Sequence, residues 1–166
     1  MPLEVKASQV AGFNLGIKLV RGAYMNEERE IAQRDNTESP VWADIEGTHS
    51  CYNQCLELII ANLKSTDTLF VASHNSDSVE KAVGLVLAHG RTQNVLFGQL
   101  QGFSDHVTNN LATRGMQVFK YVPFGPTEQV MPYLVRRGQE SKQVVREQVY
   151  QNVFLKQEIK KRLRIM

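Results

Sequence analysis

The sequence has only two cysteines in 166 residues, Cys51 and Cys55. They lie four positions apart on a segment with helical periodicity, and neither a further cysteine nor a nearby histidine pair accompanies them. This pattern supports neither a zinc site nor a disulfide framework, so we expect two reduced thiols and no bound metal. The phosphate-binding fingerprints GxGxxG and GxxxxGK[ST] are also missing, which leaves a Rossmann or P-loop fold without support.

The chain also lacks a strong net charge and a long apolar run. A formal charge of +2 is too small to indicate nucleic-acid binding. No apolar segment is long enough to cross a membrane. Residues 1–13 have neither the Arg-rich amphipathic character of a transit peptide nor the apolar core of a secretory signal, and we expect a short leader there. With 42% hydrophobic and 22% charged residues, 1–166 is expected to be a single globular domain.

Apolar strands alternate with helical segments along the chain. We expect strands at 15–21, 68–73, 94–98 and 117–122, each followed by a helix. Such alternation predicts an α/β fold with a parallel sheet, covering residues 14–140. A closed (β/α)8 barrel typically needs about 250 residues and rarely fewer than about 200. Four β/α units therefore predict half of such a barrel.

The stretch from Tyr121 to Glu140 predicts a helix with one polar and one apolar face. Pro126 is expected in its first turn, where no N–H is left unpaired. The polar face combines residues three, four and seven positions apart: Tyr133, Arg136, Arg137 and Glu140. The neighbouring face is expected to pack onto a sheet: Val130, Met131, Leu134 and Val135. Two guanidinium groups beside a ring suit a small carboxylate on an apolar body, and the alternative is a solvated helix face.

Small or polar residues also end the other strands. Gly22 and Ala23 follow the first strand and allow a ligand to approach the backbone closely. The second strand ends at Ser73, His74 and Asn75, the position where barrel enzymes place their active sites. Asn75 or its neighbour is also expected to cap the next helix. The competing interpretations are an ordinary turn and an ordinary strand-end histidine.

Together these segments resemble the proline dehydrogenases, the flavin-dependent (β/α)8 barrels of proline catabolism. Five segments recur in the family's order: KLVRGAY (18–24), VASHN (71–75), FGQLQGFSD (97–105), KYVPFGP (120–126) and YLVRRGQE (133–140). The resemblance covers the chain from about residue 16 to 140. It implies that bound FAD oxidises L-proline to 1-pyrroline-5-carboxylate and that a quinone accepts the electrons. It also implies a mitochondrial location, on the matrix side of the inner membrane.

The resemblance further implies roles for individual residues. Flavin contacts would come from Lys18, Val20, Gly22, Ala23, His74, Asn75 and Gln99. Substrate contacts would come from Tyr24, Leu100, Tyr121, Tyr133, Arg136, Arg137 and Glu140. The two arginines would hold the carboxylate, and Glu140 would pair with a basic group on an early strand. Tyr121 stands where the family's hydroxyproline branch has a smaller residue, so we expect a preference for proline over 4-hydroxyproline.

The chain departs from the family before Gly16. A strand lysine and aspartate near the substrate amine and a glutamine near the flavin should precede this position, and only fifteen residues do. We interpret the chain as the C-terminal half of the enzyme, and a fragment, a splice form and a degenerate copy all fit. The alternative is a non-catalytic half barrel that acts as a binding or assembly module. Unpaired strand edges favour self-association. Residues 141–166 are expected to form a basic amphipathic helical tail, with weak contact to anionic lipid as an open alternative.

Overall fold

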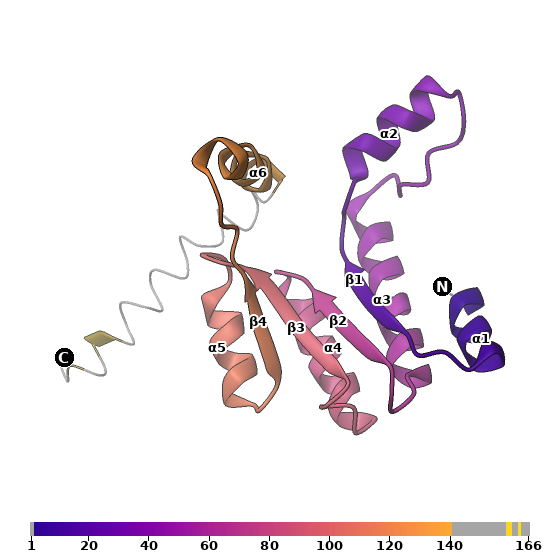
Figure 1. Ribbon diagram of the computed structural model, residues 1–166, viewed down its shortest axis with the longest axis vertical. Helices are drawn as coiled ribbons and strands as arrows, with labels where there is room; N and C mark the ends of the chain where they lie inside the picture. Colours follow the sequence, from indigo (N-terminus) through magenta and orange to yellow (C-terminus); the bar gives the residue numbers. More distant parts are fainter. Residues whose placement is uncertain (1, 141–158, 161–162, 164–166) are drawn as a thin grey trace. The chain divides into compact units, whose positions relative to one another are not determined.

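The computed structural model of the chain describes residues 2–140, 159, 160 and 163. Strands and helices alternate along it (Figure 1). The strands are β1 (Gly16–Val20), β2 (Thr68–Ala72), β3 (Val95–Leu100) and β4 (Gln117–Tyr121). The helices are α1 (Pro2–Ala11), α2 (Met25–Arg34), α3 (Ile45–Asn62), α4 (Ser76–Ala88), α5 (Asp105–Thr113) and α6 (Thr127–Glu140).

The strands form one sheet in the order β1-β2-β3-β4. β1 pairs with β2 in parallel, from Gly16 opposite Thr68 to Val20 opposite Ala72, and β2 pairs with β3 in parallel as well. Parallel neighbours need a crossover connection, and a helix lies between each pair of consecutive strands. The predicted α/β fold with barrel-type units is therefore confirmed. β3 runs two residues further than expected, to Leu100.

The chain divides into two compact units, Met1–Gly98 and Gln99–Met166. In the first unit, α3 lies against β1 and α4 (Figure 1). Alternation along β2 buries Leu69 and Val71 completely and leaves Phe70 and Ala72 half-exposed. The fully buried core of this unit consists of Leu56, Ile60, Leu69, Val71, Ala82, Val83, Val86, Val95 and Phe97. One face of these strands thus holds the core, and the other carries partly exposed side chains.

In the second unit, α5 packs on β4 (Figure 1). Its buried apolar residues are Val107, Leu111 and Met116. The expected packing of the apolar face of α6 onto the sheet is not seen among the described residues, because Met131 and Leu134 are 48% and 42% exposed. Amphipathic spacing identifies an apolar face, but it does not identify the surface that covers it.

Capping fixes the helix boundaries where periodicity placed them only approximately. The Asp44 carboxylate accepts a hydrogen bond of 2.7 Å from the Gly47 amide and so caps α3, which begins at Ile45. α6 begins at Thr127, one residue after Pro126, and the proline carbonyl accepts bonds from two amides of the first turn. The residues expected as a leader include a helix, α1.

The predicted C-terminal tail lies outside the described residues, except for residues 159, 160 and 163. Ile159 and Leu163 are exposed. Within the described part of the chain, no helix combines the length and the apolar character needed to cross a membrane. Cys51 and Cys55 are free thiols on α3, as predicted.

Candidate functional site

The aromatic and basic residues of α6 form a contact pair in the second unit. The Arg137 guanidinium carbon lies 5.5 Å from the centre of the Tyr133 ring, a cation–π arrangement. From the end of β4, the Tyr121 ring lies 5.8 Å from that of Tyr133, with 52° between the ring planes. Three residues that the sequence assigned to the substrate are thus brought together.

The Tyr133 phenol stays protonated in this setting. Burial raises its pKa, and the neighbouring Tyr121 raises it further, while Arg137 and Arg136 oppose the rise. At neutral pH the group is therefore a neutral hydroxyl that can donate or accept a hydrogen bond. The positive charge on α6 comes from Arg136 and Arg137.

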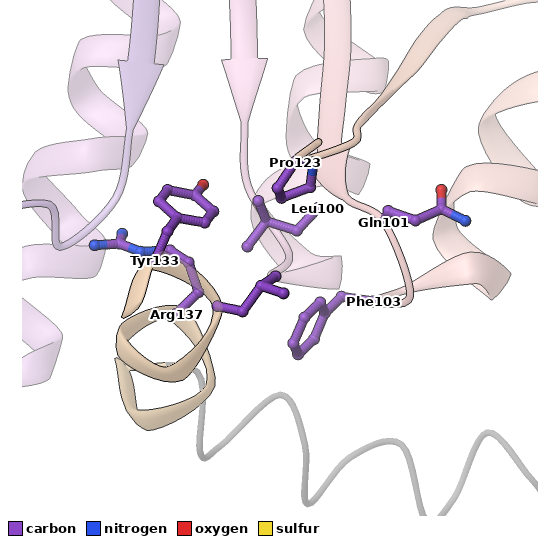
Figure 2. A pocket seen from close by; sticks show the side chains of 7 residues that line it. Leu100, Gln101, Phe103, Pro123, Tyr133 and Arg137 are labelled. Carbon is purple, nitrogen blue, oxygen red and sulfur yellow. The ribbon is translucent and has the colours of Figure 1, made fainter. Parts of the chain in front are cut away.

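A small hollow adjoins this pair (Figure 2). It is lined by Leu100, Gln101, Phe103, Pro123, Tyr133, Leu134 and Arg137. Its volume of about 30 Å³ is room for a water molecule rather than for a whole amino acid. The hollow that the described residues of this unit form is therefore too small by itself to hold an amino acid. Leu100, which the resemblance assigned to the substrate, contributes an apolar side chain to the hollow at the end of β3.

The backbone explains why these residues meet. The Gln101 amide donates to the Tyr121 carbonyl at 2.9 Å, which holds the end of β3 beside the end of β4. Pro123 then restricts the backbone after β4, and α6 follows at Thr127. Phe103 and Pro123 were missed as lining residues, although both lie within segments that the sequence singled out. Their positions depend on the turn geometry, which periodicity does not describe.

The remaining residues assigned to the substrate lie in different settings. Arg136 is exposed on α6. Glu140 ends the helix, and its side chain lies outside the described part. Gln99, assigned to the cofactor, is 4% exposed, and its Oε1 accepts a 2.8 Å hydrogen bond from the Thr108 hydroxyl of α5. The Gln99 side chain is therefore engaged with the helix that covers its strand.

In the first unit, the residues assigned to the cofactor lie at the ends of β1 and β2. Lys18 and Val20 are exposed on β1, opposite Phe70 and Ala72 of β2. Beyond the strand, Gly22 has a φ of 68°, which favours glycine, and Ala23 is exposed. His74 follows β2 and is half-exposed.

Tyr24 has an unusual backbone. It precedes α2 with φ 58° and ψ 14°, a left-handed conformation that is uncommon for an aromatic residue. Its side chain is 73% exposed, so burial of the ring is not what holds it there. Strained residues of this kind are often found at functional sites.

Hydrogen bonds tie the end of β1 to the start of α4. Arg21 donates from Nη1 to the Ser78 hydroxyl at 3.0 Å, and that hydroxyl donates to Oδ1 of Asn53 at 3.2 Å. The predicted cap is confirmed at Asn75, whose Oδ1 accepts from the Ser78 amide at 2.9 Å. The start of α4 is thereby fixed beside the loop that follows β1.

These features of the first unit fit a negatively charged ligand. Lys18 supplies an exposed cation, and Gly22 allows close approach to the backbone because nothing lies within 4 Å of where its Cβ would be. The N-terminus of α4 offers the positive end of a 13-residue helix. The exposed cation and the helix N-terminus therefore suit a negatively charged group. The described part of the chain contains no group of three or more potential metal ligands.

The fold defines a class: an α/β protein with parallel β/α units of the (β/α)8-barrel type. Among solved structures, the proline utilization A protein of Bdellovibrio bacteriovorus superimposes with a TM-score of 0.76, at 23% identity over 84% of this chain and 15% of that one. At this identity the likeness establishes the fold alone.

The family follows from the sequence comparisons. The family profile described as proline dehydrogenase matches residues 3–148, and the chain belongs to this family. The chain is 42% identical to proline dehydrogenase 1, mitochondrial, of Dictyostelium discoideum, over 96% of this chain and 29% of that protein. It is 41% identical to hydroxyproline dehydrogenase of Bos taurus, over 96% of this chain and 36% of that protein. The chain thus spans about a third of the length of these relatives.

Proposed function

We propose that this chain supplies the C-terminal half of the catalytic domain of a proline dehydrogenase that oxidises L-proline to 1-pyrroline-5-carboxylate and passes the electrons to a quinone. The observation that carries the proposal is the Tyr133–Arg137 pair beside Leu100. It combines a carboxylate-binding group with an apolar surface for a small ring. Family membership supplies the reaction.

The second unit would bind the substrate. Arg137, with Arg136 next to it on α6, would hold the carboxylate of proline. Tyr121, Tyr133 and Leu100 would enclose the apolar ring and exclude water. Positioning of the substrate would supply most of the rate, since a correctly oriented reactant removes much of the entropic barrier.

The first unit would hold FAD. Lys18 and the start of α4 would bind its negative charge, and Gly22 would allow its close approach to the backbone. His74 at the end of β2 would donate or accept a hydrogen bond to it. Bound FAD would supply the two-electron oxidation that amino-acid side chains cannot perform. Because relatives are named mitochondrial, we propose the same location for this protein.

The 166-residue chain by itself is expected to bind FAD weakly or not at all and to be inactive. β1 and β4 end the sheet of the described residues, and edge strands carry unpaired backbone groups. Self-association through such edges is the expected state. Size-exclusion chromatography with light scattering, together with flavin absorbance at about 450 nm, tests both expectations.

The function itself is best tested in a chimera. This chain would replace the matched segment of the Dictyostelium proline dehydrogenase, and proline-dependent reduction of a dye would be measured with bound FAD quantified separately. We expect turnover, and we expect Arg137→Met to lower kcat/KM by about a hundredfold or more, because a charge-assisted contact to the substrate is lost. A matched Arg114→Met variant, outside the proposed site, should not change kcat/KM.

Two results would reject the proposal. One is a chimera that retains FAD and does not oxidise proline. The other is an Arg137→Met variant with unchanged kcat/KM. The non-catalytic alternative, a half barrel that only mediates assembly, predicts the first result.

Substrate preference is a separate proposal. Tyr121 lies 5.8 Å from the Tyr133 ring and would leave little room for a hydroxyl on the substrate ring. Relatives named for proline and for hydroxyproline match almost equally well, at 42% and 41% identity, so overall identity does not decide the preference. We expect the chimera to prefer proline and Tyr121→Ser to shift kcat/KM toward 4-hydroxyproline. Equal values for the two substrates before substitution would reject the role of Tyr121.

A further inference from the structure

Lys120 lies on β4 between two residues that face away from it. Phe119 and Tyr121 are 49% and 57% exposed, whereas the Lys120 side chain is only 19% exposed. Its ammonium lies 2.5 Å from the carbonyl oxygen of Phe103 and 2.7 Å from Oδ1 of Asp105. Because alternate side chains of a strand point to opposite faces, Lys120 binds the turn after β3 from the face opposite to Tyr121.

The turn that Lys120 binds leads from the wall of the hollow into α5. Ser104 is 1% exposed and left-handed, with a φ of 52°, a conformation that surrounding contacts must maintain in a residue with a side chain. The Phe103 amide donates to the Leu100 carbonyl at 3.1 Å, which closes the turn. Both Leu100 and Phe103 line the hollow. The conformation of this turn therefore determines where Leu100 and Phe103 lie in the wall of the hollow.

A second set of hydrogen bonds supports the same turn from α5. The Thr108 hydroxyl donates to Gln99 at 2.8 Å and lies 3.3 Å from the Ser104 carbonyl oxygen. The carbonyls of two consecutive residues are thus bound: Phe103 accepts from the Lys120 ammonium of β4, and Ser104 accepts from the Thr108 backbone amide of α5 at 3.1 Å. A charged donor forms the stronger of these contacts, because ionic hydrogen bonds are about twice as strong as neutral ones.

We propose that Lys120 is a positioning residue for substrate binding. Through the Phe103 carbonyl it holds the turn at residues 101–105, and thereby holds Leu100 and Phe103 in the wall of the hollow that Tyr133 also lines. Lys120 itself does not contact the substrate. The inference rests on the proposed function for the identity of that substrate, an amino acid with a small apolar ring.

A substitution at Asp105 distinguishes the positioning role of Lys120 from that of an ordinary surface ion pair. Asp105→Asn removes the charge pair and leaves the contact between Lys120 and the Phe103 carbonyl, whereas Lys120→Met removes both. An exposed ion pair contributes little by itself, and the Asp105 side chain is 62% exposed. We therefore expect Lys120→Met to have the large effect and Asp105→Asn the small one.

The first measurement is hydrogen exchange in the 166-residue chain, which needs no turnover. In Lys120→Met the Phe103 amide should exchange at least about tenfold faster, because the turn that closes onto Leu100 opens more often. The Met116 amide, bonded to the Leu111 carbonyl at the end of α5 and outside the turn, is the internal control and should change by less than about threefold. Unchanged exchange at Phe103 would overturn the proposal, whatever the activity.

The second measurement is steady-state kinetics in the chimera. Lys120→Met should raise KM for proline by about tenfold with kcat changed by less than about threefold, since a displaced wall weakens substrate binding first. Asp105→Asn should stay within about threefold in both constants. An unchanged KM in Lys120→Met, or an equal rise in Asp105→Asn, would overturn the positioning role alone. A parent chimera that retains FAD and does not turn over would reject the proposed function, and the substrate role of Lys120 with it.

Discussion

The α3 helix of the first unit and the α6 helix of the second are covered to very different extents. On α3, Leu56, Ile59 and Ile60 are at most 1% exposed. On α6, Met131, Leu134 and Val135 are 48%, 42% and 52% exposed. Both helices have apolar spacing typical of a buried face. Only α3 has its apolar face covered within the unit described.

The elements that stabilise the first unit are thus different from the helix that carries the candidate substrate residues. Each fully buried large aliphatic or aromatic side chain contributes about 1.5–3 kcal/mol, so the buried rows of α3, β2 and α4 stabilise the first unit. α6 contributes little of that kind within the described residues, yet it carries Tyr133 and Arg137. The apolar face of α6 is therefore left uncovered by the described residues of its unit.

The largest expected effect tests this contrast directly. Phe97 on β3 is completely buried, and Phe97→Ala should lower the free energy of unfolding by about 3–5 kcal/mol, through lost burial and the cavity that remains. Leu134→Ala on α6 should change it by less than about 0.5 kcal/mol, because that side chain is already 42% exposed. Urea unfolding followed by circular dichroism measures both.

Phe97→Leu serves as the milder variant, with an expected loss of about 1 kcal/mol, in case Phe97→Ala does not fold. Leu87→Ala is the matched control in the first unit, because Leu87 on α4 is 54% exposed. Equal losses for Phe97→Ala and Leu134→Ala would contradict the contrast between the two units.

The next effect is a pH dependence that belongs to the first unit. Burial raises the pKa of Tyr52 to about 12, with Arg21 and Ser73 opposing the rise. The unfolded chain loses this proton near pH 10, and the folded chain keeps it until about pH 12. The contribution of Tyr52 to the free energy of unfolding is therefore fully present below pH 10. It falls by about 2–3 kcal/mol as the pH rises to 12.

Lysines titrate over the same range, so the measurement is the difference between the wild-type chain and Tyr52→Phe. The phenylalanine variant has no proton to lose at this position, and its free energy of unfolding should fall less steeply between pH 10 and 12. Parallel curves for the two proteins would show that Tyr52 is not held neutral by folding.

The fold was largely predictable because it depends on local patterns. Bounded apolar runs located all four strands to within two residues, and the helical spacing of Tyr133 and Arg137 placed them on one face. The spacing did not distinguish the two arginines with respect to the hollow. Arg137 lines it, whereas Arg136, rotated by about 100° on the helix, is not among its lining residues.

What could not be predicted depends on contacts between distant segments. The meeting of Tyr121 and Tyr133 depends on the conformation of the turn at Pro123–Pro126. The Lys120 contact with the Phe103 carbonyl joins residues 17 positions apart. A lysine in a strand pattern indicates only a solvated side chain. The exposed face of α6 is a property of the tertiary structure as well, since spacing alone makes it resemble α3.

A third test concerns the sheet of the first unit. A Cβ at Gly98 on β3 would lie 2.3 Å from two carbons of the Phe70 ring on β2. Gly98→Ala should therefore displace this ring and cost about 1–3 kcal/mol. Phe70→Leu should relieve the clash, so the double variant should lose less than the sum of the two single ones. Additive losses, measured by urea unfolding, would show that the ring does not restrict Gly98.

The smallest expected effect has the opposite sign and lies at the site rather than in the core. Tyr24 is left-handed at φ 58°, and its ring is 73% exposed, so the backbone is strained with little burial in return. Asparagine adopts this conformation more readily, and Tyr24→Asn should raise the free energy of unfolding by about 0.5–1 kcal/mol. Tyr24→Phe keeps the strain and should leave the free energy of unfolding within about 0.3 kcal/mol of that of the wild-type chain.

In the chimera, Tyr24→Asn should lower kcat/KM for proline despite its greater stability, since strain persists where function requires a particular side chain. Thermal unfolding and steady-state kinetics on the same variants measure the two effects, and a variant that gains both stability and activity would mean that Tyr24 is not part of the substrate site.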